Sequence, residues 1–206
     1  MVFFVPFASE WLEISIFAAM INAAIFASGE GTNAENLFRY FANDPRIKIK
    51  LVVTNKDNAG VVARAEKYKK NVQIVSKAAL ENYTDQLIEF LKVEKIDLII
   101  LAGFLLKLPE AFVRAFPNKI INLHPALLPK YGGAGMYGMH VHRAVLANKE
   151  KESGITIHYV NEEYDKGEII LQATSSILDT DTPESLAKKI QLLEFEYLPK
   201  AVERFL

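Results

Sequence analysis

Apolar and polar residues follow two different periods along this chain. Short apolar runs are typical of buried strands, and apolar residues three or four positions apart are typical of amphipathic helices. The strands predicted from the apolar runs are 23–27, 47–54, 72–75, 98–102, 120–123, 155–160 and 169–173. The helices predicted from the wider spacing are 33–43, 61–70, 83–93, 109–116, 139–148 and 183–205.

This regular exchange of strand and helix predicts an α/β fold. A helix between two strands is the usual crossover of a parallel sheet, and such sheets carry helices on both faces. We therefore expect a mostly parallel, twisted, Rossmann-like sheet covered by helices on both sides. The chain contains no internal repeat and no linker-like segment, so residues 20–206 are expected to form a single domain.

The first 19 residues differ from the remainder, because they are rich in Phe and contain no Lys or Arg. A secretory signal needs a basic segment, so none is predicted here. Glu13 and Asn22 interrupt the apolar stretch, and no membrane span is expected. We interpret residues 1–19 as an N-terminal extension upstream of a true start at Met20. The alternative is a genuine arm that contacts the domain or a partner.

Composition narrows the class of protein further. Half of the 206 residues are apolar, which is typical of globular chains and excludes disordered or fibrous ones. The absence of cysteine excludes a disulfide scaffold, a thiolate metal site and a cysteine nucleophile, and it fits a cytoplasmic protein. The 24 basic and 25 acidic side chains nearly cancel, so neither nucleic acid nor an anionic membrane is an expected partner.

A glycine-rich turn follows the first predicted strand and leads directly into a helix, with the order Ser28-Gly29-Glu30-Gly31-Thr32-Asn33. Glycines let a backbone approach an anion closely, and the free N–H groups of a helix start favour negative charge. The turn lacks the third glycine of a dinucleotide site and the lysine of a Walker loop. It is either a phosphate site or a tight turn in which Thr32 caps the helix.

A second candidate lies at the end of a later strand, where Asn122 and His124 are two positions apart. Residues at this spacing face the same side of an extended chain, and Pro125 favours an extended conformation at His124. An amide N–H stabilises a developing oxyanion, and an imidazole transfers protons near neutral pH. The alternative is a pair of polar side chains that only satisfy nearby backbone groups.

Asp165, in the turn Asp165-Lys166-Gly167, is the candidate partner of this histidine. A carboxylate beside His124 would raise the imidazole pKa and fix the ring orientation. His140 and His142 lie at a predicted helix start, where side chains two positions apart diverge, and no third metal ligand accompanies them. We therefore interpret both as structural and expect no metal site.

Several segments together resemble a known enzyme family. They read F-A-S-G-E-G-T-N-A-E-N-L, V-T-N-K-D-N-A-G-V, L-A-G-F-L-L-K-L, I-N-L-H-P-A-L-L-P-K-Y-G-G and Y-D-K-G-E-I-I-L-Q. The chain from Met20 onward is similar to the formyltetrahydrofolate transferase family, and within it to the phosphoribosylglycinamide formyltransferases. The resemblance implies transfer of a formyl group from 10-formyltetrahydrofolate to the amine of 5′-phosphoribosylglycinamide, a step of purine synthesis. It implies small-molecule substrates and no metal, in a monomer or homodimer.

The resemblance also assigns roles residue by residue. It implies that Asn122 holds the formyl oxygen, that His124 is the general acid and that Asp165 keeps His124 protonated. The substrate phosphate would lie on Gly31, Thr32 and Asn33, and the ribose near Gln191 and Glu194. The residues implied in folate binding are Leu105, Leu106, Lys107, Leu108, Asn122, Asn161, Glu162, Glu163 and Tyr164.

Three features depart from the common pattern of that family. Glu30 stands where Asn is more usual, and Leu80 and Leu106 stand where many members have Arg. A contact to the glutamate arm of the folate would therefore have to come from another residue. The loop 132–139 is longer than in short members, and we interpret it as an insertion rather than a flap beside the site. The alternative functions are hydrolysis of formyltetrahydrofolate and a non-catalytic nucleotide-binding module.

Overall fold

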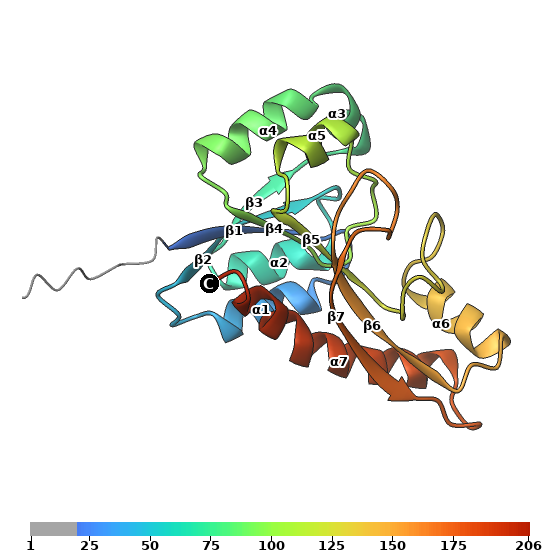
Figure 1. Ribbon diagram of the computed structural model, residues 1–206. Coiled ribbons are helices and arrows are strands. Elements are labelled where there is room, and N and C mark those ends of the chain that lie inside the picture. Colours follow the sequence, from blue (N-terminus) through green and yellow to red (C-terminus); the bar gives the residue numbers. More distant parts are fainter. Residues whose placement is uncertain (1–19) are drawn as a thin grey trace, which may run out of the picture.

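The computed structural model describes residues 20–206, and its centre is one seven-stranded sheet (Figure 1). The spatial order of the strands is β3-β2-β1-β4-β5-β6-β7. Strands β1 to β5 are parallel, and β6 and β7 are antiparallel to their neighbours. The strands are β1 (Ile21–Phe26), β2 (Ile47–Thr54), β3 (Asn71–Ile74), β4 (Leu98–Leu101), β5 (Ile120–His124), β6 (Glu152–Tyr159) and β7 (Ile169–Ser176).

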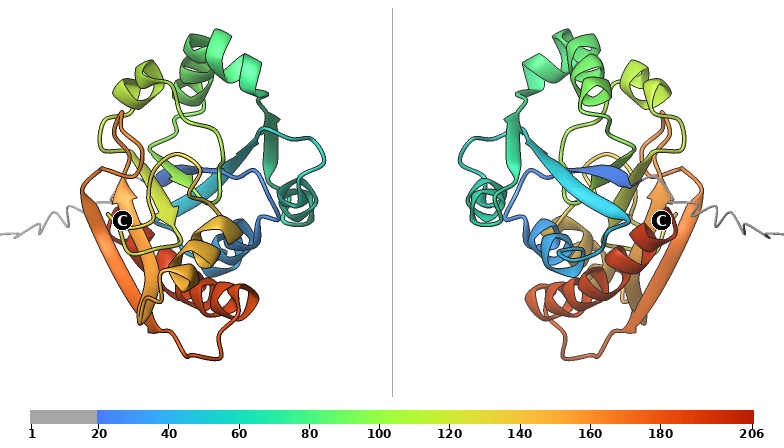
Figure 2. Two further views of the ribbon diagram at one scale, coloured as in Figure 1. Left: turned by 90° about the vertical axis from the view of Figure 1, so that its right-hand side faces the viewer. Right: turned by 90° about the vertical axis from the view of Figure 1, so that its left-hand side faces the viewer.

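Helices cover both faces of the sheet, as the sequence predicts. In Figure 1, α3, α4 and α5 lie on one side of the sheet and α1 and α7 on the other, and the turned views of Figure 2 show the same two layers. The helices are α1 (Thr32–Tyr40), α2 (Gly60–Lys67), α3 (Lys77–Asn82), α4 (Thr84–Val93), α5 (Glu110–Ala115), α6 (Met139–Ala147) and α7 (Pro183–Glu203). The mostly parallel α/β fold is confirmed.

The central strands are apolar along their whole length because both of their faces are buried. In β1, Ala23 and Ile25 belong to the core under α1 and α7, whereas Ala24 and Phe26 belong to the core under α4 and α5. A strand that is covered on both faces reads as a continuous apolar run, and the sequence prediction depended on this property.

The differences from the prediction lie at short or polar segments. Helix α3 was not predicted, because its six residues are too few to show a helical period. Its start is nevertheless marked by Ser76, whose hydroxyl accepts a hydrogen bond from the N–H of Ala79 at 3.1 Å. Strand β6 begins at Glu152 rather than at residue 155, because its polar first residues pair with the end of β7.

The strand order reverses between β1 and β4, since β2 follows β1 on one side and β5 follows β4 on the other. Ligands of open α/β sheets bind beyond the carboxyl ends of the strands at such a reversal. No helix within residues 20–206 is long and apolar enough to cross a membrane. Residues 1–19 lie outside the described part, so the predictions of an extension and of a single domain from Met20 stay predictions.

Candidate active site

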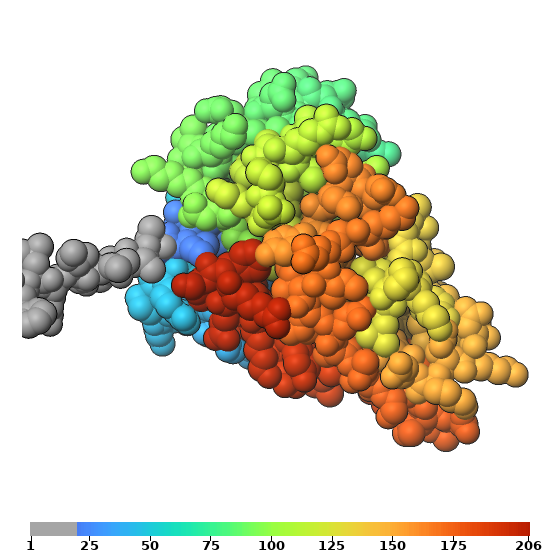
Figure 3. Space-filling model, in the orientation of Figure 1, coloured from blue at the N-terminus to red at the C-terminus, as the bar shows by residue number. Residues whose placement is uncertain are grey.

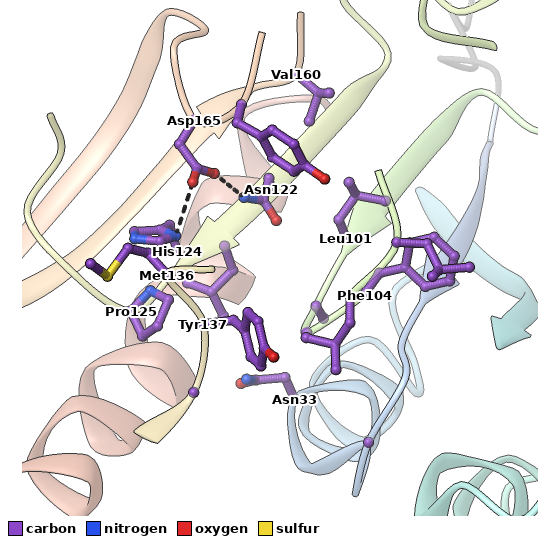
Figure 4. Close-up of a pocket in the computed structure, with 18 of the residues that line it drawn as sticks. Asn33, Leu101, Phe104, Asn122, His124, Pro125, Met136, Tyr137, Val160 and Asp165 are labelled. Carbon is purple, nitrogen blue, oxygen red and sulfur yellow. Dashed lines mark hydrogen bonds and ion pairs between the residues drawn. The ribbon is translucent and has the colours of Figure 1, made fainter. Parts of the chain in front are cut away.

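A cavity of about 680 Å³ opens at the carboxyl ends of β1, β4 and β5. Its walls come from segments far apart in the sequence: the turn after β1, residues 101–108 after β4, the end of β5, the loop before α6, residues 160–165, and one face of α7. Figure 4 shows how these side chains converge on the cavity. The volume lies in the range of small-molecule sites.

Gly31 shapes the turn after β1. Its φ is +73°, in the left-handed region, and a Cβ at this position would lie 2.5 Å from Cβ of Val61. Gly31 is also the N-cap residue of α1, and among the described residues no side chain caps this helix. Thr32 is therefore the first helical residue and not the cap, and the first N–H groups of α1 stay available to a ligand.

The carboxylate of Glu30 points toward α2. A Cβ built on Gly60, the first residue of α2, would lie 2.7 Å from Oε2 of Glu30. The guanidinium Nε of Arg64 donates to the backbone carbonyl of Glu30 at 2.7 Å. The carboxylate thus lies at the positive N-terminal end of α2, which favours negative charge.

Helix α7 contacts the start of α1 through two polar side chains. Asn33 donates from Nδ2 to Oε2 of Glu194 at 2.8 Å, and Gln191 donates from Nε2 to the Thr32 hydroxyl at 3.4 Å. Burial raises the pKa of Glu194, and the hydrogen bond from Asn33 offsets part of this effect. Oδ1 of Asn33 is buried without a hydrogen-bond partner within residues 20–206, so it is an acceptor left for a ligand.

Asn122, His124 and Asp165 come together at the opposite wall (Figure 4). Nδ1 of His124 lies 3.7 Å from Oδ2 of Asp165, and Nδ2 of Asn122 lies 3.4 Å from Oδ1 of the same carboxylate. The backbone N–H of Gly133 donates to Oδ2 of Asp165 at 2.8 Å. The predicted shared face of Asn122 and His124 is therefore confirmed, and Asp165 is beside both.

The other ring nitrogen of His124, Nε2, lies 2.7 Å from the backbone carbonyl oxygen of Tyr131. Because a carbonyl only accepts, Nε2 carries a proton and Nδ1 is the atom that faces Asp165. Tyr131 and Asp165 both have positive φ, 58° and 53°. Such backbone conformations cost about 1–3 kcal/mol each in non-glycine residues and are common at functional sites.

The pKa of His124 differs from the expectation that Asp165 keeps this ring protonated. Burial lowers the pKa of His124 below its ordinary value, and the charge of Asp165 and the hydrogen bond to Tyr131 offset only part of this. The carboxylate therefore raises the pKa as predicted, but burial has the larger effect and favours neutral imidazole. Burial alone would raise the pKa of Asp165, but the contact with His158, the hydrogen bond from Gly133 and the nearby His124 hold it below its usual value.

The sequence interpretation missed His158, which is 2% exposed and also faces this carboxylate. Its Nε2 lies 3.6 Å from Oδ1 of Asp165 and 3.1 Å from Nδ2 of Asn122, and its Nδ1 lies 2.7 Å from the carbonyl oxygen of Tyr159. His158 on β6 is the antiparallel partner of Asn122 on β5. The available signal was a histidine in an otherwise apolar strand, but the pairing of β5 with β6 was unknown.

The loop before α6 forms a wall of the cavity and so lies beside the site, and its interpretation as an insertion stays a prediction. Met136 and Tyr137 line the cavity, and Tyr137 extends toward Asn33 across the site (Figure 4). His142, interpreted as structural, is buried and lines the same cavity. In Figure 3 the yellow to gold surface lies at the right-hand end of the molecule, next to the orange surface of later residues.

The residues that the resemblance implied in folate binding line the cavity, with one exception. The exception is Glu162, whose carboxylate lies 3.4 Å from Nε of Arg114 and outside the cavity wall. Gln191 and Glu194 line it as expected. Within residues 20–206, no group of three or more His, Asp or Glu side chains could hold a metal ion.

Comparison with known proteins places this chain in a family. The family model described as formyl transferase matches residues 21–202. The chain therefore belongs to the formyl transferase family.

Several proteins with this kind of name are similar to the chain over most of its length. The chain is 40% identical, over 81% of its length, to the chloroplastic phosphoribosylglycinamide formyltransferase of Arabidopsis thaliana, of which it spans 59%. It is 34% identical to the phosphoribosylglycinamide formyltransferase of Haemophilus influenzae, over 90% of this chain and 87% of that one. The crystal structure of phosphoribosylglycinamide formyltransferase from Bacillus halodurans superposes with a TM-score of 0.82 at 34% identity, covering 89% of this chain and 94% of that one.

Proposed function

We propose that this chain transfers the formyl group of 10-formyltetrahydrofolate to the amine of 5′-phosphoribosylglycinamide. The observation that carries this proposal is one cavity with two chemically different ends. One end holds the uncapped start of α1, which suits a phosphate, and the other holds Asn122, His124 and Asp165, which suit acyl transfer. The similarity to named phosphoribosylglycinamide formyltransferases supports the same substrates.

The placement of groups in the cavity follows from these two ends. The phosphate lies on the N–H groups of Gly31, Thr32 and Asn33, and the ribose hydroxyls face Glu194 and Gln191. A hydroxyl can donate to the free Oδ1 of Asn33, whose Nδ2 is already bound to Glu194. The folate enters from the side of Leu105–Leu108 and residues 161–164, where apolar side chains and backbone groups line the wall.

Nδ1 of His124 accepts and then releases the proton that moves during the reaction. In the free protein the lowered pKa favours neutral imidazole with a lone pair on Nδ1, because the Tyr131 carbonyl fixes the proton on Nε2. His124 takes the proton that the attacking amine loses and returns it to the leaving nitrogen of the folate. Asp165 stabilises the imidazolium that exists between these two transfers.

Asn122 stabilises the negative charge that develops on the formyl oxygen. Its Nδ2 now contacts His158 at 3.1 Å and Asp165 at 3.4 Å. The second contact is long for a hydrogen bond, so one N–H is exchanged toward the formyl oxygen at small cost. A preorganised donor of this kind contributes ~3–4 kcal/mol to a transition state.

An absorbance assay of folate turnover, with and without the ribonucleotide, tests the proposal. We expect tetrahydrofolate to form only with the ribonucleotide present, and His124→Ala to lower kcat by ~10²–10⁴-fold. His140→Ala is the matched control, because His140 is exposed and does not line the cavity. Release of formate without ribonucleotide would instead identify a hydrolase, and folate binding without turnover would identify a non-catalytic module.

The compartment and the assembly state stay predictions, namely a cytoplasmic monomer or homodimer. The Arabidopsis relative is named chloroplastic, so the compartment differs among similar proteins.

A further inference from the structure

The charges around the cavity are distributed unevenly. Acidic residues line it at Glu163, Asp165 and Glu194, and Glu30 is a fourth lining residue whose carboxylate points toward α2. Among the described residues that line it, Lys107 is the only Lys or Arg. Both substrates of the proposed function are anionic, one through its phosphate and the other through the glutamate arm of the folate. The position of Lys107 in the cavity therefore indicates which of these two anions it binds.

Lys107 lies in the segment after β4. Its Nζ lies 5.3 Å from the centroid of the Tyr164 ring, so the ammonium is held over an aromatic face. Tyr164 directly precedes Asp165 in the chain, and this contact places Lys107 at the wall that leads to the polar cluster.

The acidic neighbours of this wall are already paired with other cations. Glu163 pairs with Lys166, and Glu162 pairs with Arg114. Within residues 20–206, no carboxylate lies within the 4.0 Å of an ion pair from Nζ of Lys107. Lys107 is thus a cation that stacks on Tyr164 and has no counter-ion among the residues that the structure describes.

The surface around Lys107 combines this cation with apolar groups. Leu105 is 46% exposed and Tyr164 is 44% exposed, although both line the cavity. An aromatic ring joined to a carboxylate-bearing chain would contact these apolar groups first and reach the ammonium next. The aminobenzoyl-glutamate arm of a folate has this chemical order.

We propose that Lys107, held over the ring of Tyr164, binds the carboxylates of the folate's glutamate arm and sets the preference for glutamylated donors. This rests on the proposed function and adds to it the residue that recognises the arm. It also supplies the cation that Leu80 and Leu106 do not provide.

Isothermal titration calorimetry with two ligands tests the assignment. The ligands are 10-formyltetrahydrofolate and 10-formyltetrahydropteroate, which lacks the glutamate. We expect the wild-type chain to bind the folate about three- to fivefold more tightly at low salt, the range of one exposed ion pair, and less so as salt rises. Lys107→Ala removes this preference, and Lys107→Glu reverses it.

Three further variants make the result specific. Lys119→Ala is the matched control, since Lys119 is an exposed lysine that does not line the cavity, and it keeps the preference. Tyr164→Phe also keeps it, because the ring remains, whereas Tyr164→Leu reduces it. Thermal unfolding of each variant confirms that the fold is intact.

The outcomes separate the two proposals. If Lys107→Ala retains the wild-type preference, or raises only the Kd of the ribonucleotide, the assignment of Lys107 to the glutamate arm is wrong while the proposed function stands. If the wild-type chain binds neither pterin ligand, the proposed function itself fails.

Discussion

The carbonyl oxygen of Tyr131 lies 2.7 Å from Nε2 of His124 and so determines which ring nitrogen serves the cavity. With the proton fixed on Nε2, Nδ1 is the atom that gains and loses a proton, and it lies 3.7 Å from Asp165. The pKa of His124 reflects two opposing effects, since burial lowers it and the charge of Asp165 raises it. Removing the charge of Asp165 therefore lowers the pKa of His124 further.

The first prediction concerns Asp165→Asn. Without the carboxylate charge the pKa of His124 falls further, and the imidazolium formed during proton transfer loses its partner. We expect kcat to fall by ~10²–10³-fold, within the usual contribution of acid–base catalysis. Because the neutral form starts the reaction, the rise of kcat/KM with pH moves to lower pH.

Nitrogen-detected NMR titration of His124 and a pH profile of kcat/KM measure both effects. Asp179→Asn is the control, because Asp179 is 99% exposed and its one ion-pair partner within residues 20–206 is Lys151. A titration of His124 that is the same in wild type and Asp165→Asn would contradict the assigned coupling.

The second prediction concerns His158, which holds Asp165 and Asn122 in place through Nε2. Gln can place its amide oxygen near the position of Nε2, where it accepts from Nδ2 of Asn122, whereas Asn is too short. We expect His158→Asn to lower kcat by ~10–100-fold with little change in KM, and His158→Gln to retain more activity. Steady-state kinetics on both variants, with unfolding curves as a control for folding, measure this. Equal activities of the two variants would show that Nε2 is not the atom that matters.

The third prediction concerns Gly31→Ala. The φ of +73° and the 2.5 Å approach of a Cβ to Val61 both oppose a side chain here. We expect a loss of ~1–3 kcal/mol in the free energy of unfolding and a higher KM for the ribonucleotide. Gly29→Ala is the matched control, since a Cβ there meets nothing within 4 Å. Urea unfolding and kinetics separate the two variants, and similar losses in both would contradict the special role of Gly31.

The sequence predicts those parts of the molecule whose physics is local. The buried strand β4 and the glycine turn after β1 carry their signals within a few residues, and both are found where expected. His158 and the loop before α6 could not be placed in this way, because their contacts with Asp165 depend on how β6 pairs with β5 and on how the loop folds back. The pKa of His124 depends on burial by the whole fold, so its direction was not predictable from Asp165 alone.

The last prediction concerns Glu194, whose carboxylate is held against α1 by Asn33. Burial raises its pKa in the folded state above the ordinary value of 4.5. Below pH 4.5 the group is protonated in both the folded and unfolded chain and costs nothing. As pH rises through the folded-state pKa, the unfolded chain ionises more easily, and the folded chain loses stability relative to a neutral side chain.

Glu194→Gln is therefore expected to unfold at a higher temperature than wild type at pH 7, and the difference should shrink toward zero near pH 4.5. For a domain of this size each ~1 kcal/mol corresponds to ~2–4 °C. The same variant should bind the ribonucleotide ~10-fold more weakly, because it loses a charged acceptor for the ribose hydroxyls. Glu196→Gln, exposed on the same helix, should change neither quantity appreciably. Calorimetric unfolding at several pH values and ribonucleotide titration measure the two effects. A Glu194→Gln variant that is less stable than wild type at pH 7 would show that the carboxylate serves the fold rather than the ligand.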